Sequence, residues 1–299
     1  MTTHNVASLT IDVEDGINIS MRDNFKVEME PTARVEGNVE VILEICERNG
    51  VKATFFILGE VAGKFPAMIK RIADRGHEIG VHGYEHDQIF KLTPDKLKSS
   101  LERARALMED QTGQEIRGFR APAFSINTRT SWALPIIAGS GFSYDSSIFP
   151  SLSLRYGWKD FSKDICRIDL GNSVSLVEVP LSVHTMMGRD IPVGGGGYLR
   201  YFPYSFTRRA LQRISKDRSP IVYLHPYELD TERYPDYYHE AIAKSPLKKR
   251  LVLSLYRFKK GTVKSKLERI TREFEFLPLK DIIDKLEENQ SIPTISLEQ

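Results

Sequence analysis

Cysteine is scarce in this chain of 299 residues, and so is any excess of charge of one sign. The two cysteines, Cys46 and Cys166, lie far apart and match no metal-binding or redox spacing, so we expect buried, reduced thiols. The 42 Lys and Arg residues nearly balance the 40 Asp and Glu residues, which leaves a formal charge of +2. This balance produces no global field that would attract nucleic acid, and we expect no nucleic-acid partner.

Long hydrophobic runs are missing as well. The sequence has no stretch of about 18 apolar residues that could form a transmembrane helix. The first ten residues include His4, Asn5 and Ser8 and lack the basic region and apolar run of a signal peptide. We therefore expect a cytoplasmic protein that is at most peripheral to the inner membrane.

The sequence does contain a regular alternation of apolar strands and helices. Strands are expected at 6–13, 52–59 and 77–81, with helices over 35–46 and 61–72 between them and a long loop over 17–34. Strand–helix–strand units with short links are typical of a parallel sheet. The alternation continues to a strand at 221–224, a closing strand at 274–279 and a helix at 281–287. No internal repeat or linker divides the chain, so we expect one α/β domain.

Polar residues follow four of these strands. They are, in chain order, Asp12, Glu14 and Asp15, then His82 and His86, then Arg120, and finally His225. Functional residues in parallel α/β folds gather where the strands end. Two histidines four residues apart can bind one metal ion, because neutral imidazole is a common zinc ligand. The alternative is an acidic turn and two histidines that never meet.

These residues belong to motifs that occur in a specific order. The motifs are Asp12-Val13-Glu14-Asp15, His82-Gly83-Tyr84-Glu85-His86, Arg120-Ala121-Pro122 and Leu224-His225. In this order they resemble the polysaccharide deacetylases with a NodB homology domain, which are similar to carbohydrate esterase family 4. The resemblance covers about residues 6–285. It is strongest to the subgroup of exopolysaccharide and O-antigen gene clusters, through the Phe-Arg-Ala-Pro, Tyr-Asp-Ser-Ser, Gly-Gly-Gly-Tyr and His-Pro-Tyr-Glu motifs.

The resemblance implies a fold and a cofactor. The fold would be a deformed (β/α) barrel that forms a single domain over residues 1–299, with a core at about 6–230 and a C-terminal extension at about 231–299 packing on it. The cofactor would be a divalent metal, Zn²⁺ first and otherwise Co²⁺, Ni²⁺, Mn²⁺ or Fe²⁺, which activates water and polarises an amide carbonyl. His82 and His86 would be ligands. Because the usual Asp-Asp pair is absent, the carboxylate ligand could be Glu14 or Asp15.

The resemblance also implies catalytic roles. Asp12 would be the general base, Arg120 would pair with Asp12 and orient it, and His225 would protonate the leaving amine. A backbone N–H within residues 121–124 would help to stabilise the oxyanion. Candidate substrate-binding residues are Pro122, Phe124, Tyr144, Asp145, Tyr198 and Tyr227, with Trp158 as a further aromatic residue of the sugar-binding rim.

The expected activity is removal of an N-acetyl group from an amino sugar of a polysaccharide or glycan precursor, with a lipid- or nucleotide-linked sugar as the candidate substrate. A cyclic-amide hydrolase similar to allantoinase and a non-catalytic carbohydrate-binding relative are the alternatives. The oligomeric state is left open.

Two further segments have local patterns of their own. Residues 194–197 are four glycines without the Gly-Lys-Ser/Thr that follows in a phosphate loop, so we expect a flexible or close-approach loop at the rim of the site. Residues 241–267 contain nine Lys and Arg residues, no acid and an apolar helical stripe. This segment could contact an anionic membrane, or it could be a solvated outer helix whose apolar side packs on the barrel.

Overall fold

A computed structural model of the protein describes residues 6–151, 157–257 and 260–297. Most of its strands form one ten-stranded sheet, in the order β10-β1-β2-β3-β4-β5-β7-β6-β12, with β11 pairing beside β1. The strands are β1 (Val6–Val13), β2 (Thr54–Ile57), β3 (Glu78–Val81), β4 (Gly118–Phe119), β5 (Tyr144–Asp145), β6 (Cys166–Asp169), β7 (Ser175–Glu178), β10 (Ile221–Leu224), β11 (Glu275–Phe276) and β12 (Thr294–Ser296). A separate hairpin joins β8 (Val183–Met186) to β9 (Arg189–Pro192).

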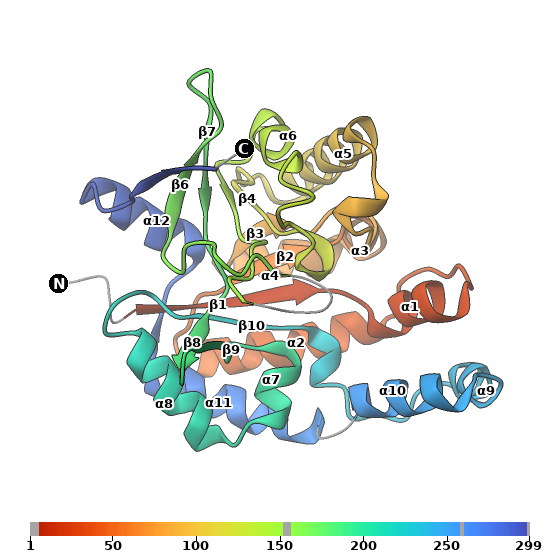
Figure 1. Cartoon of the computed structure of the whole chain (residues 1–299). Helices are drawn as coiled ribbons and strands as arrows, with labels where there is room; N and C mark the ends of the chain where they lie inside the picture. The colour runs from red at the N-terminus through yellow and green to blue at the C-terminus, as the bar shows by residue number, and fades with distance from the viewer. Residues whose placement is uncertain (1–5, 152–156, 258–259, 298–299) are drawn as a thin grey trace.

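All neighbouring strands of the large sheet are parallel except β6 and β7, which are antiparallel. The prediction of a parallel α/β sheet curved into a deformed barrel is therefore confirmed. Figure 1 shows β1 crossing the centre of the molecule. β1 pairs with β10 on one side and with β2 on the other, so the segments that follow these strands emerge at the same edge.

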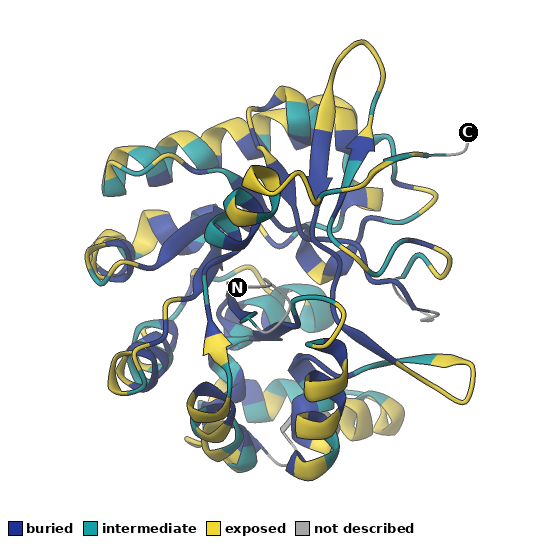
Figure 2. Cartoon of the chain, turned by 90° about the vertical axis from the view of Figure 1, so that its left-hand side faces the viewer, coloured by how far each residue is buried: buried dark blue, intermediate teal, exposed yellow. Residues whose placement is uncertain are grey.

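Helices surround the sheet and turn their outer faces to solvent, as Figure 2 shows. The α-helices are α1 (Gly16–Ser20), α2 (Arg34–Arg48), α3 (Gly59–Lys64), α4 (Pro66–Asp74), α5 (Pro94–Thr112), α6 (Ala133–Gly139), α7 (Gly196–Tyr201), α8 (Tyr204–Ile214), α9 (Asp236–Ala243), α10 (Leu247–Arg257), α11 (Val263–Glu273) and α12 (Leu279–Glu288). Short 3₁₀ turns lie at Ile89–Lys91, Pro122–Phe124, Pro226–Glu228 and Lys260–Thr262.

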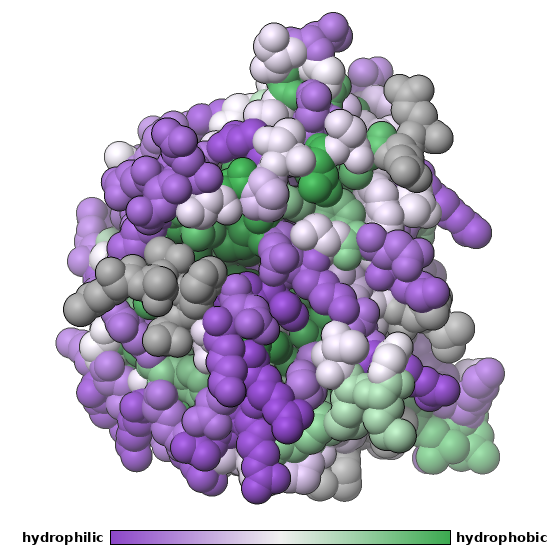
Figure 3. All heavy atoms as spheres, turned by 60° about the vertical axis from the view of Figure 1, so that its left-hand side comes forward, coloured by the Kyte–Doolittle hydropathy of each residue, from purple (hydrophilic) through white to green (hydrophobic). Residues whose placement is uncertain are grey.

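The largest cluster of the core gathers aliphatic and aromatic side chains from the strands and the helices around them, and smaller clusters lie beside it. α2 illustrates how the sequence builds it, because Val35, Val39, Ile42 and Cys46 recur at helical spacing and are all buried. Figure 3 shows a mainly hydrophilic outer face, with hydrophobic side chains visible in the hollows between polar ones. Both Cys46 and Cys166 are buried free thiols, as expected.

The segment after β1 differs from its prediction. Residues 17–34 were expected to be a loop, but they include α1 and a π-helical turn, η2 (Met21–Phe25). The buried Ile17 and Met21 pack in one cluster with Tyr234 and Tyr238. These partners lie more than 200 positions away in the chain, so the pattern within residues 17–34 alone could not reveal the packing that stabilises these turns.

The glycine run approaches the sheet closely, as predicted. A Cβ on Gly195 would lie 1.8 Å from the carbonyl oxygen of Tyr223, and one on Gly194 would lie 2.3 Å from that of Ile221. Only glycine permits this approach to β10. The run leads into α7 rather than into an extended loop.

Residues after 231 add strands to the sheet as well as helices around it. β11 pairs with the start of β1, and β12 pairs with β6. In the described part of the chain, no helix is long and apolar enough to cross a membrane.

Candidate functional site

Five strand ends meet at one edge of the sheet and bring the candidate residues together. β1 is followed by Glu14, β3 by His82, β4 by Arg120, β5 by Ser146 and β10 by His225. The strands are parallel neighbours in one sheet, so their carboxyl ends lie side by side. Residues up to 213 positions apart in the chain thus form one site.

Glu14, His82 and His86 form a compact group of possible metal ligands. Their donor atoms all lie within 4.8 Å of one another, and this is the one such group among the described residues. Glu14 Oε1 lies 2.9 Å from His82 Nε2 and 3.1 Å from His86 Nε2. All three side chains are buried or nearly so. The alternative in which the two histidines never meet is therefore wrong.

The donor set fits a divalent cation. His82 Nδ1 lies 2.8 Å from the carbonyl oxygen of Arg120, and because a carbonyl can only accept, Nδ1 carries a proton and donates to it. His82 Nε2 faces Glu14 Oε1 at 2.9 Å. At this distance either a proton or a cation has to lie between the two atoms. Two imidazole nitrogens and one carboxylate are a usual ligand set for zinc and related ions.

The pKa values of Glu14 and His86 reflect how close the carboxylate lies to the histidines. Burial alone would raise the pKa of Glu14, but the facing His86 and His225 hold that pKa well below its usual value. Burial alone would lower the pKa of His86, yet the carboxylates of Glu14 and Asp23 raise it to about 10. The site is therefore a place where a buried carboxylate attracts positive charge.

Asp15 has a different position from Glu14. Its side chain accepts hydrogen bonds from the backbone N–H of Ile17, at 2.9 Å, and of Thr32. It is the N-cap of α1 and ties the following loop to that helix. Of the two carboxylates that the sequence left open, the structure thus places Glu14 beside the histidines and Asp15 at the helix end.

Asp12 and Arg120 form a buried ion pair next to the three candidate ligands. Arg120 Nη1 lies 2.8 Å from Asp12 Oδ1 and 2.8 Å from Thr10 Oγ1. Both charged side chains are almost completely inaccessible to solvent. The guanidinium also lies over the ring of Phe56, 4.3 Å from its centroid. A buried pair with this many partners holds Asp12 in one orientation.

Ser146 and Ser147 hold Arg120 and its turn in place, and neither was predicted as a site residue. Arg120 donates to the Ser146 carbonyl at 2.9 Å and to Ser146 Oγ at 2.8 Å. The Ala121 N–H donates to Ser147 Oγ at 2.7 Å. The Tyr-Asp-Ser-Ser motif carried a signal for this contact, since hydroxyls directly after a strand end face the site.

A pair of buried carboxyls lies behind these serines. Ser147 donates to Asp145, and Asp145 and Glu178 are hydrogen-bonded to each other. Burial raises the pKa of Asp145 to about 6, and burial together with Asp145 raises that of Glu178 well above its usual value. A single proton shared between the two carboxyls satisfies this arrangement. Glu178 also accepts from the Ile148 N–H at 2.9 Å.

His225 completes the site from β10. Its Nε2 lies 3.9 Å from Asp12 Oδ2 and 4.0 Å from Glu14 Oε1. Its Nδ1 lies 3.4 Å from Glu228, whose other oxygen lies 3.4 Å from Arg200. Burial alone would lower the pKa of His225, but Glu14, Glu228 and Asp12 raise it to about 9.

Tyr227 positions the His225 ring from one side. The two rings stack with their centroids 4.8 Å apart. Tyr227 in turn packs on Gly16, where a Cβ would lie 2.7 Å from the tyrosine ring. Arg200, which binds Glu228, comes from α7 directly after the glycine run. The close approach of that run to β10 therefore helps to place the groups that hold His225.

The remaining predicted substrate-binding residues fall into different places. Tyr144 and Asp145 are fully buried, so neither is part of an exposed rim, contrary to the prediction. Tyr144 donates to Glu78 at 2.8 Å, deep in the sheet, because alternate residues of its strand point into the barrel. Tyr198 and Trp158 are partly exposed, and Tyr198 stacks on Phe202.

Pro122 and Phe124 lie in the turn after Arg120. Phe124 packs on Phe149 and Tyr223 and is nearly buried. Ala123, between them, is exposed and has a left-handed backbone, as does Phe124. Non-glycine residues with positive φ are uncommon and cluster at functional turns.

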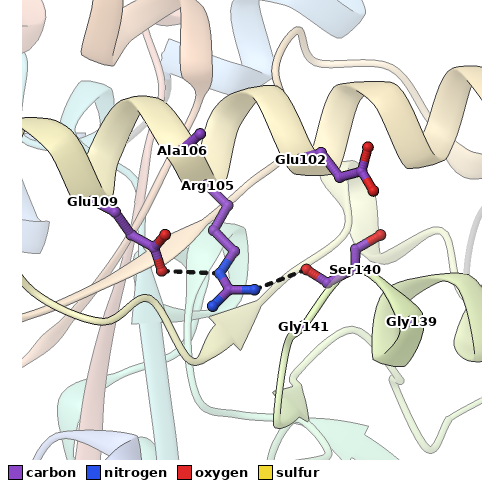
Figure 4. Close-up of a pocket in the computed structure, with 7 residues that line it drawn as sticks. All are labelled: Glu102, Arg105, Ala106, Glu109, Gly139, Ser140 and Gly141. Carbon is purple, nitrogen blue, oxygen red and sulfur yellow. Dashed lines mark hydrogen bonds and ion pairs between the residues drawn. The ribbon is translucent and has the colours of Figure 1, made fainter.

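A separate surface hollow lies between α5 and α6, as Figure 4 shows. It is lined by Glu102, Arg105, Ala106, Glu109, Gly139, Ser140 and Gly141. Arg105 occupies it and donates to Glu109 and to the Ser140 carbonyl, each at 3.0 Å. The third charged residue of the hollow, Glu102, lies 3.8 Å from Lys98, and none of the candidate site residues lines this hollow.

A metal-ligand group, a buried carboxylate–arginine pair and a histidine at the ends of parallel strands are features of hydrolytic centres. Comparison with known proteins agrees with this class. Residues 4–135 match the polysaccharide deacetylase family, and residues 146–284 match a domain of unknown function, DUF3473. The chain therefore contains a polysaccharide deacetylase domain over residues 4–135.

Several curated relatives have similar sequences. A peptidoglycan-N-acetylglucosamine deacetylase of Bacillus cereus is 37% identical over 93 residues, which is 31% of this chain and 34% of the relative. A peptidoglycan deacetylase of Helicobacter pylori is 29% identical over 48% of this chain and 53% of the relative. The matched regions thus span between a third and about half of these relatives.

Solved structures support the fold. A putative polysaccharide deacetylase from Mycobacterium smegmatis superposes with a TM-score of 0.65 at 20% identity, over 98% of this chain and 94% of the other. Puue allantoinase superposes with a TM-score of 0.61 at 14% identity, over 97% and 93% of the two chains. At these identities the likeness shows the shared deformed barrel.

Proposed function

We propose that this protein is a metal-dependent hydrolase that removes the N-acetyl group from an amino sugar of a polysaccharide or glycan precursor. The observation that carries the proposal is the convergence of Glu14, His82 and His86 with the Asp12–Arg120 pair and His225 at one edge of the sheet. The match of residues 4–135 to the polysaccharide deacetylase family and the peptidoglycan deacetylases among the relatives of the chain support the same chemistry.

Glu14, His82 and His86 would hold the cation, with Zn²⁺ as the first choice for two imidazoles and a carboxylate. Co²⁺, Ni²⁺, Mn²⁺ and Fe²⁺ accept the same ligand types. When bound, such an ion polarises a carbonyl and makes a water molecule more acidic. The hydrogen bond from His82 to the Arg120 carbonyl would keep the His82 ring in the tautomer that a ligand needs.

Asp12 would act as the general base, because its Oδ2 lies 3.9 Å from His225 Nε2 while Arg120 binds its Oδ1. Asp12 would take a proton from the attacking water, and His225 would give a proton to the leaving amine. Glu228 and Tyr227 would orient the His225 ring for this transfer. His225 Nε2 lies 3.9 Å from Asp12 Oδ2 and 4.0 Å from Glu14 Oε1, separations that one planar amide group can bridge.

The turn after Arg120 would assist at the carbonyl oxygen. The Ala121 N–H is bonded to Ser147, the Phe124 N–H to the Ala121 carbonyl, and Pro122 has no N–H. This leaves the Ala123 N–H as the donor of the described turn that could stabilise an oxyanion. Its left-handed backbone would set the direction of that N–H.

The substrate would be an N-acetylated amino sugar attached to an anionic carrier, either a lipid or a nucleotide. The exposed cations Lys244, Lys248 and Arg250 support this choice, because both carriers are polyanionic. Pro122, Phe124, Tyr198 and Tyr227 would provide apolar contacts to the sugar.

Acetate release from a panel of N-acetylated amino sugars tests the proposal. The metal-loaded wild type would be compared with Asp12→Asn and His82→Ala. We expect release that requires a divalent metal and is lost in both variants, with Asp12→Asn still binding metal. Release by neither the wild type nor the variants, together with hydrolysis of a cyclic amide by the wild type, would contradict the proposal. Sugar binding without hydrolysis of either substrate class would indicate a non-catalytic relative.

A further inference from the structure

The helix α10 presents an unusual outer face. Leu247 and Leu251, one helical turn apart, are 68% and 58% exposed, and Val252 beside them is 45% exposed. Leu253, on the inner side, is 4% exposed. An ordinary surface helix turns its apolar residues inward. Here most of the apolar stripe whose side chains are described points to solvent, so packing on the barrel does not explain it.

The same face carries positive charge. Lys248 and Arg250 are exposed on α10, and Lys244 precedes it. Two other cations of residues 241–267 make hydrogen bonds within the fold. Lys260 is buried against the Tyr234 hydroxyl, and Lys266 donates to backbone carbonyls after α7. Among the described residues, the exposed Lys244, Lys248 and Arg250 lie on or next to the helix with the exposed leucines, and Lys264 is exposed on α11. The acids of α9, Asp236 and Glu240, lie before this basic surface begins.

The helix is firmly attached beside the candidate site. Lys249, on its inner side, donates to the Asn24 carbonyl and lies 4.7 Å from the centre of the Phe25 ring. Tyr238 of α9 packs edge-on against Phe25, with the ring centres 5.9 Å apart. These contacts join α9 and α10 to η2, and Asp23 of η2 lies 3.8 Å from His86.

The arrangement gives the surface a defined orientation. Figure 1 shows α9 and α10 at the end of the molecule toward which β1 points, where α1 also lies. The candidate ligands follow β1 and β3 at this same end. A flat partner that contacts α10 would therefore lie near the opening of the site.

We propose that α10 is a docking surface for an anionic lipid bilayer. Leu247, Leu251 and Val252 insert among the headgroups, while Lys244, Lys248 and Arg250 contact lipid phosphates. A short basic helix with an exposed apolar stripe has the composition of an interfacial helix. Each cation near an anionic bilayer adds about 1 kcal/mol, or about fivefold, in binding. The docking needs no catalysis, so it is independent of the proposed activity.

Vesicle co-sedimentation of the full chain tests the docking. The probes are vesicles of equal parts phosphatidylglycerol and phosphatidylcholine, with pure phosphatidylcholine as the neutral control. We expect binding to the anionic vesicles that weakens with salt. Lys248→Glu/Arg250→Glu should bind at least roughly 25-fold more weakly, from two cations at about fivefold each. Leu247→Ser/Leu251→Ser should bind at least about tenfold more weakly.

Matched variants on another surface control for general changes in charge and hydrophobicity. Lys216→Glu changes an exposed lysine, and Met187→Ser changes a methionine that is 95% exposed, both away from α10. Both should bind vesicles like the wild type. The α10 variants should keep the wild-type melting temperature and metal affinity, because the changed side chains face solvent.

Three results would overturn the proposal. The first is a wild type that does not bind anionic vesicles. The second is binding that survives both α10 double variants, which would place the contact elsewhere. The third is a wild-type dimer that Leu247→Ser/Leu251→Ser dissociates without any change in vesicle binding, which would make a second copy of this chain the occupant. Acetate release from a soluble substrate, measured on the same samples, separates loss of docking from loss of activity.

Discussion

Two parts of the chain match two different families, residues 4–135 and residues 146–284. They meet at the candidate site and supply different kinds of groups to it. The first part contains Asp12, Glu14, His82, His86 and Arg120, in short motifs after β1, β3 and β4. The second part contains His225 and most of the groups that hold these residues in place. Those supporting groups are Ser146, Ser147, Glu178, Arg200, Tyr227 and Glu228.

The proposed ligands and base occur in short sequence motifs of the first part. Part of what orients them comes from residues of the second part. Arg120 is bound by Ser146 of the second part, and the His225 ring is held by Glu228 and Tyr227 of its own part. Variants in the first part should therefore remove chemistry. Variants in the second part should mainly disturb positions or stability, with His225 as the exception.

The largest effect is expected for Glu14→Gln in the first part. Loss of the carboxylate ligand should abolish tight metal binding and lower acetate release by about a thousandfold or more, because a bound cation contributes several kcal/mol to such reactions. Metal titration calorimetry and acetate release measure the two effects. Asp15→Ala is the matched control, which should keep metal affinity and lose only about 1 kcal/mol of stability with its helix cap. Equal loss of metal in both variants would contradict the assignment of Glu14.

The next effect concerns His225, the proposed general acid, which lies in the second part. His225→Gln should lower acetate release by about 10²- to 10⁴-fold, the range for loss of a general acid, while metal affinity stays within a few-fold of wild type. A substrate with a leaving amine that needs no protonation should be hydrolysed nearly as fast by the variant as by the wild type. If metal affinity fell as steeply as activity, His225 would have to be counted among the ligands.

Breaking the connection between the two parts should cost stability. Arg120→Met would leave Asp12 as a buried charge without its partner and would remove the contacts to Ser146. Loss of one partner of a buried ion pair typically costs about 3–5 kcal/mol. Urea unfolding measures the change, and Asp12→Asn/Arg120→Met should recover part of it, since the unpaired charge is then gone. If Arg120→Met were about as stable as the wild type, the contacts of Arg120 with Asp12 and Ser146 would not be needed for stability.

The smallest effect is a pH dependence that comes from the second part. The folded-state pKa values of Asp145 and Glu178 are raised above those of the unfolded chain, so the folded protein retains a proton that the unfolded chain releases. Stability from this pair is therefore complete at low pH and declines as the pH rises through the raised values, by up to about 1.4 kcal/mol per pH unit.

Glu178→Gln isolates this contribution, because the amide can donate to Asp145 without titrating. Between pH 5 and pH 8, the wild type should lose more unfolding free energy than the variant as the pH rises. Chemical unfolding across this range measures it. A difference that does not vary with pH would show that the two carboxyls share no proton.

The order of strands and helices, the parallel sheet and the candidate residues at strand ends could all be predicted from sequence. Local patterns determine these features, because a buried strand such as residues 6–13 is a short, mostly apolar run, and an amphipathic helix such as residues 34–48 repeats its buried apolar residues at helical spacing. The close approach of the glycine run could also be predicted, since only glycine tolerates it.

What the sequence alone could not decide are the contacts between distant segments. It left Glu14 and Asp15 equivalent, and only the folded chain turns one toward His82 and His86 and the other toward the N–H groups of α1 and Thr32. It also suggested Tyr144 and Asp145 for an exposed rim, although both are buried. One residue along a strand or turn reverses the direction of a side chain, and only packing against segments far away in the chain determines which direction is taken.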